Sequence, residues 1–151
     1  MNIGDKCPFF KGRDQNGEEY DVSSLIGKKN LVIYFYPKNE TRVCTAQACS
    51  FRDAYATFQD NNCEVIGISG DSAKSHEAFA KHHSLPFVLL SDGDKKLRKL
   101  FKVPNDYLGL IPGRYTYIIN EEGIIVEIFH DKFNAENHTN KAFEKLNITD
   151  L

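Results

Sequence analysis

The sequence predicts an α/β fold in which a central mixed sheet is flanked by helices, with a β-hairpin near the N-terminus. The main evidence is that continuous apolar segments, typical of buried strands, alternate with segments that have the 3.6-residue period of helices. Late in the chain, two strand-like segments are separated only by a short turn, which adds an antiparallel pair to earlier parallel βαβ units. A chain of 151 residues can bury one core, so we expect a single domain over residues 1–151.

The N-terminal hairpin is predicted by a turn between two short segments. Asp14–Gly17 is a strong turn sequence, and it lies in the middle of residues 9–21. Residues 22–26 then fit one helical turn, which Gly27 ends.

The first buried strand and the first long helix follow the hairpin. Residues 30–36 are continuously apolar and rich in β-branched and aromatic residues, as in a strand covered on both faces, and Pro37 ends this strand. From Cys44 onward the period becomes that of a helix, which we expect to reach about residue 61. The apolar stripe of this helix consists of Cys44, Ala48, Phe51, Tyr55 and Phe58.

The rest of the chain continues the alternation of strands and helices. Residues 63–69 have the pattern of a second buried strand, and Asp71-Ser72 can cap a helix that ends at His82. In chain order, the remaining predicted elements are a strand at 87–90, a helix at 95–101, strands at 115–120 and 124–129 around a turn at 121–123, and a helix at 136–146.

The composition is that of an ordinary soluble globular protein, with 41% apolar and 26% charged residues. A net charge of −2 gives no reason to expect nucleic acid or an anionic membrane as a partner. No apolar stretch approaches the roughly 20 residues of a membrane span. The first residues contain no apolar signal segment, so we expect a cytoplasmic, reducing compartment.

Four cysteines are too few for a secreted fold held together by disulfides, so they are catalytic, metal-binding or simply buried. Cys44 stands at the expected start of a helix, where unpaired backbone N–H groups favour a thiolate. Thr41, three residues earlier, can cap this helix or donate a hydrogen bond to the thiolate, and Pro37 fixes the loop. We therefore assign Cys44 a functional role, rather than that of a small core residue.

Cys49 follows Cys44 by five residues, which places it about 140° around the helix axis. It therefore points away from the apolar stripe, toward the surface or a neighbouring element. A partner thiol for Cys44 is the better interpretation, because the second sulfur is close enough to trap an oxidised first one. The pair indicates cysteine redox chemistry.

The other cysteines and the histidines fit plainer roles. Cys63 opens a predicted strand, so we expect a buried structural residue, and nothing near Cys7 would activate it, although intermolecular pairing is an alternative. Structural zinc typically needs four ligands in paired short spacings, which Cys44 and Cys49 lack. The histidines form no recognisable ligand pair with these cysteines, so we expect no metal and no other cofactor.

Residues 37–44, with Pro37, Thr41 and Cys44 at their characteristic spacing, resemble the active-site loop of the peroxiredoxins. A wider likeness to the bacterioferritin comigratory protein group, also called the Q-type peroxiredoxins, covers nearly the whole chain in order. It is carried by residues 34–38, the pair Cys44 and Cys49, Ala48, residues 51–53, 64–69, 75–76, 85–87 and 89–92, and Arg114 with residues 115–119.

This resemblance implies a thioredoxin-like fold and thiol-dependent reduction of hydrogen peroxide and organic hydroperoxides. It makes Cys44 the peroxidatic cysteine and Cys49 the resolving one. Arg114, which the sequence alone would leave on the solvated surface, would stabilise the thiolate and the negative charge that develops on the leaving oxygen. Thr41 would orient the peroxide, and Pro37 would shield the thiolate from water.

Two sites depart from the family pattern. Arg42-Val43 replaces the Pro-Gly that is common before the peroxidatic cysteine, and valine stiffens a turn that glycine leaves loose. Gln47 stands where a glutamate is common, so an acidic partner for the pocket arginine is missing. Neither change removes a reacting group, so both bear on rate and substrate preference more than on the type of reaction.

We therefore expect a thiol peroxidase that works as a monomer, with a weak dimer as the alternative. Cys44 would become a sulfenic acid, Cys49 would convert it to an intramolecular disulfide, and thioredoxin or a similar dithiol would reduce that bond. Two alternatives stay open: a general thiol–disulfide oxidoreductase, which a two-residue gap between the cysteines would favour, and a redox-sensing interaction module. Peroxide turnover with catalytic amounts of reductant separates them.

Overall fold

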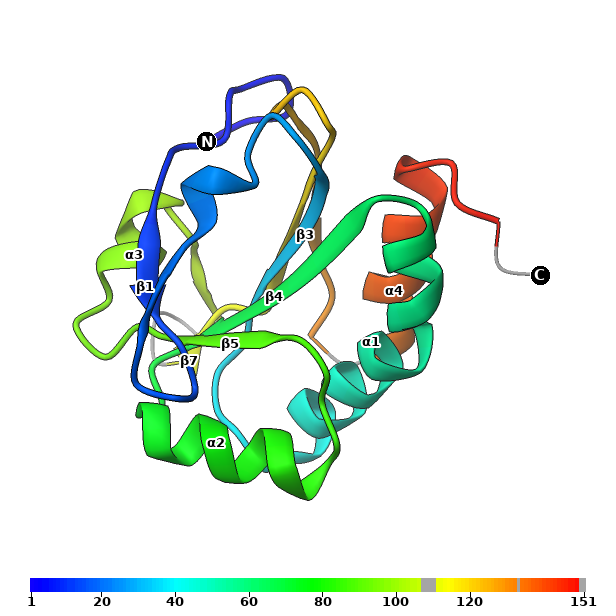
Figure 1. Cartoon of the computed structure of the whole chain (residues 1–151). Helices are drawn as coiled ribbons and strands as arrows, with labels where there is room; N and C mark the ends of the chain where they lie inside the picture. The colour runs from blue at the N-terminus through cyan, green and yellow to red at the C-terminus, as the bar shows by residue number, and fades with distance from the viewer. Residues whose placement is uncertain (107–110, 133, 150–151) are drawn as a thin grey trace.

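The computed structural model describes residues 1–106, 111–132 and 134–149. Within these ranges, one seven-stranded sheet has the order β2-β1-β5-β4-β3-β8-β9 (Figure 1). The strands of this sheet are β1 (Lys11–Arg13), β2 (Glu19–Asp21), β3 (Asn30–Phe35), β4 (Cys63–Ser69), β5 (Val88–Ser91), β8 (Tyr115–Ile119) and β9 (Ile125–His130). The helices are the 3₁₀ turn η1 (Val22–Ser24), α1 (Arg42–Asp60), α2 (Ala73–His82), α3 (Lys96–Leu100) and α4 (Ala135–Lys145).

The pairing of the strands confirms the predicted mixed sheet. β3, β4 and β5 run parallel to one another, and α1 and α2 are the crossovers between them. β8 is antiparallel to both β3 and β9, and the N-terminal hairpin β1–β2 joins the far side of the sheet through β5. The antiparallel contact of β3 with β8 brings the end of one strand beside the start of the other.

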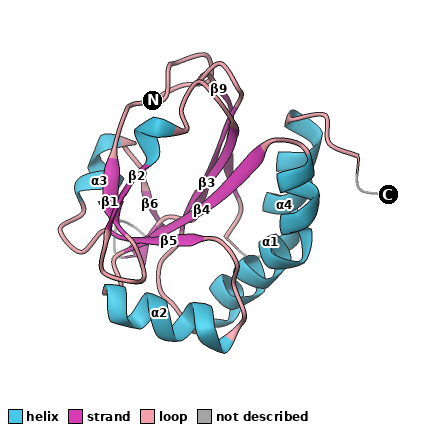
Figure 2. Ribbon diagram, in the orientation of Figure 1, coloured by secondary structure: helices cyan, strands magenta, loops and turns pink. Residues whose placement is uncertain are grey.

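Both faces of the sheet are covered, which explains why the predicted central strands are continuously apolar. Along β3, Val32 and Tyr34 contribute to a core with α1, α2 and α4, whereas Leu31, Ile33 and Phe35 contribute to a second core with η1 and α3. All five side chains are fully buried. Figure 2 shows α1 and α4 packed together on one side of the sheet and α3 on the other.

Most predicted elements match the structure to within one or two residues, and two differences bear on the site and the topology. Helix α1 begins at Arg42, two residues before the expected start at Cys44. A small two-stranded sheet, β6 (Asn105–Asp106) with β7 (Ile111–Pro112), was not predicted, because two residues are too few to show a strand period. Among the described helices, none combines the length and the apolar character needed to cross a bilayer.

Candidate active site

Cys44 is the third residue of α1, directly beyond the loop that leaves β3. Its side chain is only 1% exposed. The first backbone N–H groups of a helix have no partner within the helix, and their partial positive charge favours an anion beside them. The fold therefore gives a thiolate at this sulfur a favourable environment.

Arg114 lies directly before β8 and reaches Cys44 across the sheet. Phe35, the last residue of β3, pairs with Tyr115, the first residue of β8, so the end of β3 and the start of β8 lie at the same edge. Arg114 is 5% exposed, and its guanidinium Nη2 donates to Cys44 Sγ at 3.2 Å. The solvated position that the sequence alone favoured for Arg114 is therefore wrong, because the β3–β8 register carries this side chain inward.

Gly113 fixes the backbone just ahead of Arg114. A Cβ atom at this position would lie 2.2 Å from the Pro104 carbonyl oxygen, so only glycine fits here. The Gly113 N–H donates to the same oxygen at 3.1 Å, and Arg98 Nη1 donates to the Gly113 carbonyl at 3.4 Å. These contacts hold the start of β8 in the place that lets Arg114 meet Cys44.

Gln47, one turn after Cys44, is the second partner of the arginine. Its Oε1 accepts from Arg114 Nη1 at 2.7 Å, and its side chain is fully buried. We expected the arginine to lack a partner here, since the sequence has no glutamate at this position. The amide oxygen of Gln47 accepts the hydrogen bond instead. Within the described residues, Gln47 Nε2 and Arg114 Nε are buried N–H donors without a hydrogen-bond partner. Such donors are costly to leave unpaired, so a small oxygen-bearing ligand that reached them would be stabilised.

Thr41 and Pro37 lie in the loop that leads to α1. Thr41 is the N-cap residue, but its hydroxyl makes no cap hydrogen bond, because it donates to the Lys38 carbonyl at 2.8 Å. The helix cap, one of the two roles expected of Thr41, is therefore wrong, and in this state the hydroxyl is turned toward the loop. Pro37 is half-buried and lies two residues after Phe35, the last residue of β3.

A buried polar network that the sequence analysis missed holds this loop in place. The Asn39 backbone N–H donates to Asp71 Oδ2 at 2.9 Å, and Asn39 Oδ1 accepts from the Tyr36 hydroxyl at 2.6 Å. His76 Nε2 lies 3.1 Å from the Leu90 carbonyl, so this nitrogen carries the proton, and Nδ1 can accept from Asn39 Nδ2 at 3.0 Å. Burial lowers the pKa of His76, which keeps the ring neutral. An asparagine in a loop gave no sequence signal for such a role.

A neutral histidine lies behind the arginine. Burial lowers the pKa of His138 to about 4, and the charge of Arg114 acts in the same direction. His138 Nε2 donates to the Asp131 carbonyl at 2.9 Å, so Nδ1 is the acceptor for the Thr116 hydroxyl at 2.7 Å. Arg114 therefore has no second positive charge beside it from this ring at neutral pH.

Cys49 occupies a different setting on the same helix. It is partly exposed and lines a groove of about 440 Å³ between α1 and α4, where Ser50 Oγ and Thr139 Oγ1 are hydrogen-bonded at 2.7 Å. This placement fits the expected orientation toward a neighbouring element. Since α1 is one continuous helix, five residues separate the Cα atoms of Cys44 and Cys49 by about 8–9 Å. Both are free thiols.

Cys63 and Cys7 are buried within the two cores, at 1% and 4% exposure. Burial raises the pKa of Cys7 to about 12 and raises that of Cys63 strongly. Both therefore stay protonated at neutral pH, and a protonated thiol is a poor nucleophile. The structural role predicted for Cys63 agrees with this burial.

We expect Cys63→Ala to leave peroxide turnover within about twofold and to lower the free energy of unfolding by about 1 kcal/mol, since it removes one buried sulfur. Steady-state turnover and denaturant unfolding measure the two effects. Loss of the intramolecular disulfide of the oxidised protein in a folded Cys63→Ala variant would show instead that Cys63 is the resolving thiol.

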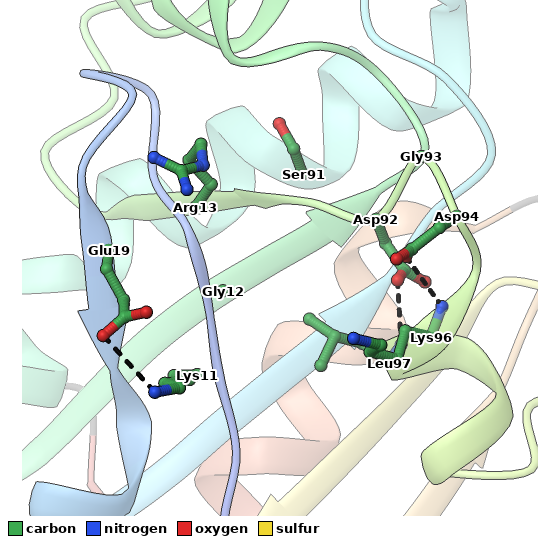
Figure 3. Close-up of a pocket in the computed structure, with 10 residues that line it drawn as sticks. All are labelled: Lys11, Gly12, Arg13, Glu19, Ser91, Asp92, Gly93, Asp94, Lys96 and Leu97. Atoms are coloured by element: carbon green, nitrogen blue, oxygen red, sulfur yellow. Dashed lines mark hydrogen bonds and ion pairs between the residues drawn. The ribbon is translucent and has the colours of Figure 1, made fainter.

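A separate pocket of about 530 Å³ lies away from the cysteines, between the N-terminal hairpin and the segment that links β5 to α3 (Figure 3). Its charged side chains are already paired in part, with Lys11 Nζ 3.6 Å from Glu19 and the Asp92 carboxylate accepting from the Leu97 N–H at 2.8 Å. No cysteine lines it. The pocket therefore contributes nothing to thiol chemistry at Cys44.

Comparison with known sequences gives consistent results. Residues 3–128 match the family described as the AhpC/TSA family. "Peroxiredoxin Q, chloroplastic" from Populus jackii is 44% identical over 146 residues, which cover 97% of this chain and 68% of that protein. The protein of the same name from Sedum lineare is 45% identical over 143 residues, covering 95% of this chain and 76% of that protein.

Solved structures share the architecture described above. Peroxidoxin BcpB from Mycobacterium tuberculosis superposes with a TM-score of 0.88 at 30% identity, covering 97% of each chain. A bacterioferritin comigratory protein from Xanthomonas campestris, whose structures address its alkyl peroxide reduction activity, gives 0.82 at 27% identity, over 91% of this chain and 90% of that one. These neighbours support the thioredoxin-like form of the α/β fold.

The names of these relatives contradict the expected cytoplasmic location. The sequence relatives are described as chloroplastic, which points to a plastid. The earlier expectation depended on the lack of an apolar signal segment, but such a segment marks secretion only. Segments that direct proteins to plastids are amphipathic and rich in serine, so an apolar search says nothing about them.

Proposed function

This chain belongs to the AhpC/TSA family and, within it, to the peroxiredoxin Q group; it is a thiol-dependent peroxidase, and we propose that Cys44 is the sulfur that the peroxide oxidises. The observation that carries this assignment is the 3.2 Å contact of Arg114 Nη2 with Cys44 Sγ at the start of α1. A fixed cation and a helix N-terminus both act on this one sulfur, and both favour the thiolate.

The first step is attack of the Cys44 thiolate on the peroxide O–O bond. The sulfur forms a bond to one oxygen and becomes a sulfenic acid, while the other oxygen leaves with the bonding electron pair and takes up a proton as water or an alcohol. Arg114 and the buried N–H of Gln47 are placed to stabilise negative charge on the leaving oxygen. Thr41 can orient the peroxide if its hydroxyl turns from Lys38, and Pro37 limits the access of water.

The second step is condensation of the Cys44 sulfenic acid with Cys49, which forms a disulfide and releases water. A disulfide requires Cα atoms about 4.4–6.8 Å apart, which is less than the 8–9 Å or so of a regular helix. The first turns of α1 must therefore unwind before the bond can form. Oxidation of Cys44 makes this unwinding easier, because a neutral sulfenic acid binds the Arg114 guanidinium less strongly than a thiolate does.

The N-terminus of α1 is poorly stabilised, so unwinding its first turns costs little free energy. Thr41 lacks the side-chain cap that usually contributes about 0.5–2 kcal/mol, and the first turn holds no acidic residue. It holds Arg42 instead, whose positive charge is unfavourable beside the positive end of the helix dipole. Of the two residues that depart from the family pattern, Arg42 thus weakens the turn that must open, whereas Val43 stiffens it.

The third step returns the protein to its starting state. A thioredoxin-type dithiol reduces the disulfide by exchange, and Cys49 is the accessible sulfur because it already lines an open groove. Since both cysteines lie on one helix, we propose that the cycle needs one chain only, as a monomer. The activity named for the Xanthomonas campestris protein suggests alkyl hydroperoxides as substrates besides hydrogen peroxide.

The test is a coupled assay with catalytic amounts of thioredoxin and thioredoxin reductase. We expect continued consumption of hydrogen peroxide and of an alkyl hydroperoxide. A general thiol–disulfide oxidoreductase would reduce disulfide substrates without turning over peroxide. A redox-sensing module would be oxidised once, with about one equivalent of peroxide, and then stop.

We expect Cys49→Ser to consume one equivalent of peroxide and then accumulate sulfenic acid on Cys44, because nothing remains to condense with it. Trapping with a sulfenic-acid reagent followed by mass spectrometry locates the label. Continued thioredoxin-dependent turnover in this variant would mean that another group resolves Cys44.

Oxidation should convert residues from about 41 to 51 from helix to an irregular loop. Hydrogen exchange of the reduced and oxidised proteins, read by mass spectrometry, should show protection lost in this segment, with β4 and α2 unchanged. An oxidised protein that contains the Cys44–Cys49 bond and keeps full protection in α1 would contradict the proposed opening.

A further inference from the structure

Three side chains with metal-binding atoms meet on the surface near the entrance to α1. Glu40 lies in the loop before this helix, His82 is the last residue of α2, and His83 is the C-cap residue of α2. Glu40 Oε2 is 2.8 Å from His82 Nδ1, and Glu40 Oε1 is 2.7 Å from His83 Nε2. One ligand atom from each residue lies within 4.8 Å of the other two.

The local backbone explains how neighbouring histidines can face one ligand. On a regular helix, consecutive side chains diverge by about 100°. The chain leaves the helix at His83, with φ −107° and ψ 8°, and the two imidazole rings come together with centroids 4.1 Å apart. Glu40 adopts a positive φ of 61°, an uncommon backbone conformation for a residue other than glycine.

The donor set fits a divalent transition metal. Two imidazole nitrogens and one carboxylate oxygen form a His₂Glu set, which binds zinc with water in the fourth position. The Glu40 side chain is 49% exposed, so its carboxylate is ionised at neutral pH like that of any solvated glutamate. On a tetrahedral zinc ion, ligand atoms lie about 3.3 Å apart, so the three atoms need move by only about 1 Å.

Exposure of the cluster allows both movement and entry of an ion. The side chains of His82 and Glu40 are 65% and 49% exposed, whereas His83 is 17% exposed and packs edge-on against Phe79. One ligand is therefore held firmly and two can adjust. We propose that Glu40, His82 and His83 form a zinc site that has no part in the peroxidase chemistry itself.

The ion would join segments that are separate in the chain. His83 already receives a hydrogen bond on its carbonyl from Arg52 Nη1 of α1, at 2.8 Å. Zinc bound at this cluster would tie the loop that leads to Cys44 to the end of α2, at a point that α1 also contacts. A zinc ion bound at this site would therefore restrain the loop next to the reactive thiol.

Zinc binding is measured by isothermal titration calorimetry on the 151-residue chain without an affinity tag. Cys44 and Cys49 are both replaced by serine, because zinc also binds thiolates. We expect about one zinc per chain. His82→Gln and Glu40→Gln should each weaken binding by at least about tenfold, since losing even a supporting residue of a metal site costs that much. Glu77→Gln, an exposed carboxylate on α2, is the matched control and should bind as the parent does.

Cobalt(II) provides an independent view of the ligands. We expect the visible absorption of a four-coordinate ion with nitrogen and oxygen donors, absent in His82→Gln. Thiolate-to-cobalt charge-transfer bands would locate the metal on Cys7 or Cys63 and overturn the proposal. Unchanged zinc affinity in both His82→Gln and Glu40→Gln would also overturn it. Neither result depends on peroxide turnover, so the proposed function is tested separately.

Discussion

Replacing Cys44 by serine is expected to abolish peroxide turnover, with a loss on the order of 10³-fold or more. Serine has nearly the same shape, so it should fill the buried site at the start of α1 without disturbing the core. Its hydroxyl is not ionised at neutral pH, and neither the helix N-terminus nor Arg114 can make it so. The variant therefore separates the chemistry of the sulfur from the packing of the side chain.

The measurement is consumption of hydrogen peroxide in the thioredoxin-coupled assay, with a sulfenic-acid trap in parallel. Cys49→Ser is the matched control, because it changes a thiol on the same helix but leaves the attacking sulfur intact. Sulfenic-acid label on Cys49 in the Cys44→Ser protein, together with residual turnover, would reverse the two assignments.

Arg114→Met should slow the attack of Cys44 on peroxide by about 10–100-fold. The Arg114–Cys44 contact is a buried hydrogen bond to a charged group, worth about 1.5–3 kcal/mol, and each 1.36 kcal/mol corresponds to a factor of about ten. Methionine fills similar volume without charge or donors. The thiolate loses its fixed cation, and the leaving oxygen loses a hydrogen-bond donor.

Thiolate absorbance against pH, with the second-order rate constant of the first oxidation, tests this prediction. Thiolate formation at Cys44 should shift to higher pH. Arg13→Met, which alters an exposed arginine on β1, is the matched control and should change neither quantity. An unchanged titration together with an unchanged rate would remove Arg114 from the reactive site.

The helices and strands of the fold could be predicted from the sequence, because their buried faces require apolar residues at regular spacings or in continuous runs. The predicted strand at 63–69 coincides with β4, since every residue from Val65 to Ser69 is buried and the run contains no interruption. The predicted hairpin and closing helix agree with the structure to within a few residues. By contrast, β6 and β7 depend on long-range pairing rather than on their own composition.

The candidate site was only partly visible in the sequence. The positions of Cys44 and Cys49 follow from helix geometry, which is local. The burial of Arg114 follows from the register of β8 against β3, which no local pattern encodes, so only family resemblance pointed to it. Gln47 was noted only as a departure from the family pattern and Asn39 was not noted at all, because the hydrogen bonds that define their roles reach partners distant in the chain.

The large sequence separation of Arg114 and Cys44 has a consequence for the chain before it is folded. These residues are 70 positions apart, and their contact exists only after β8 has paired with β3. A nascent chain that still lacks β8 carries ordinary thiols, none of them selected for oxidation. Long-range strand pairing of this kind is slow to form, because the entropy of the connecting loop is lost before the favourable contacts of the paired strands are made. Under the role proposed for Arg114, we therefore expect the full reactivity of Cys44 toward peroxide only after β8 has paired with β3.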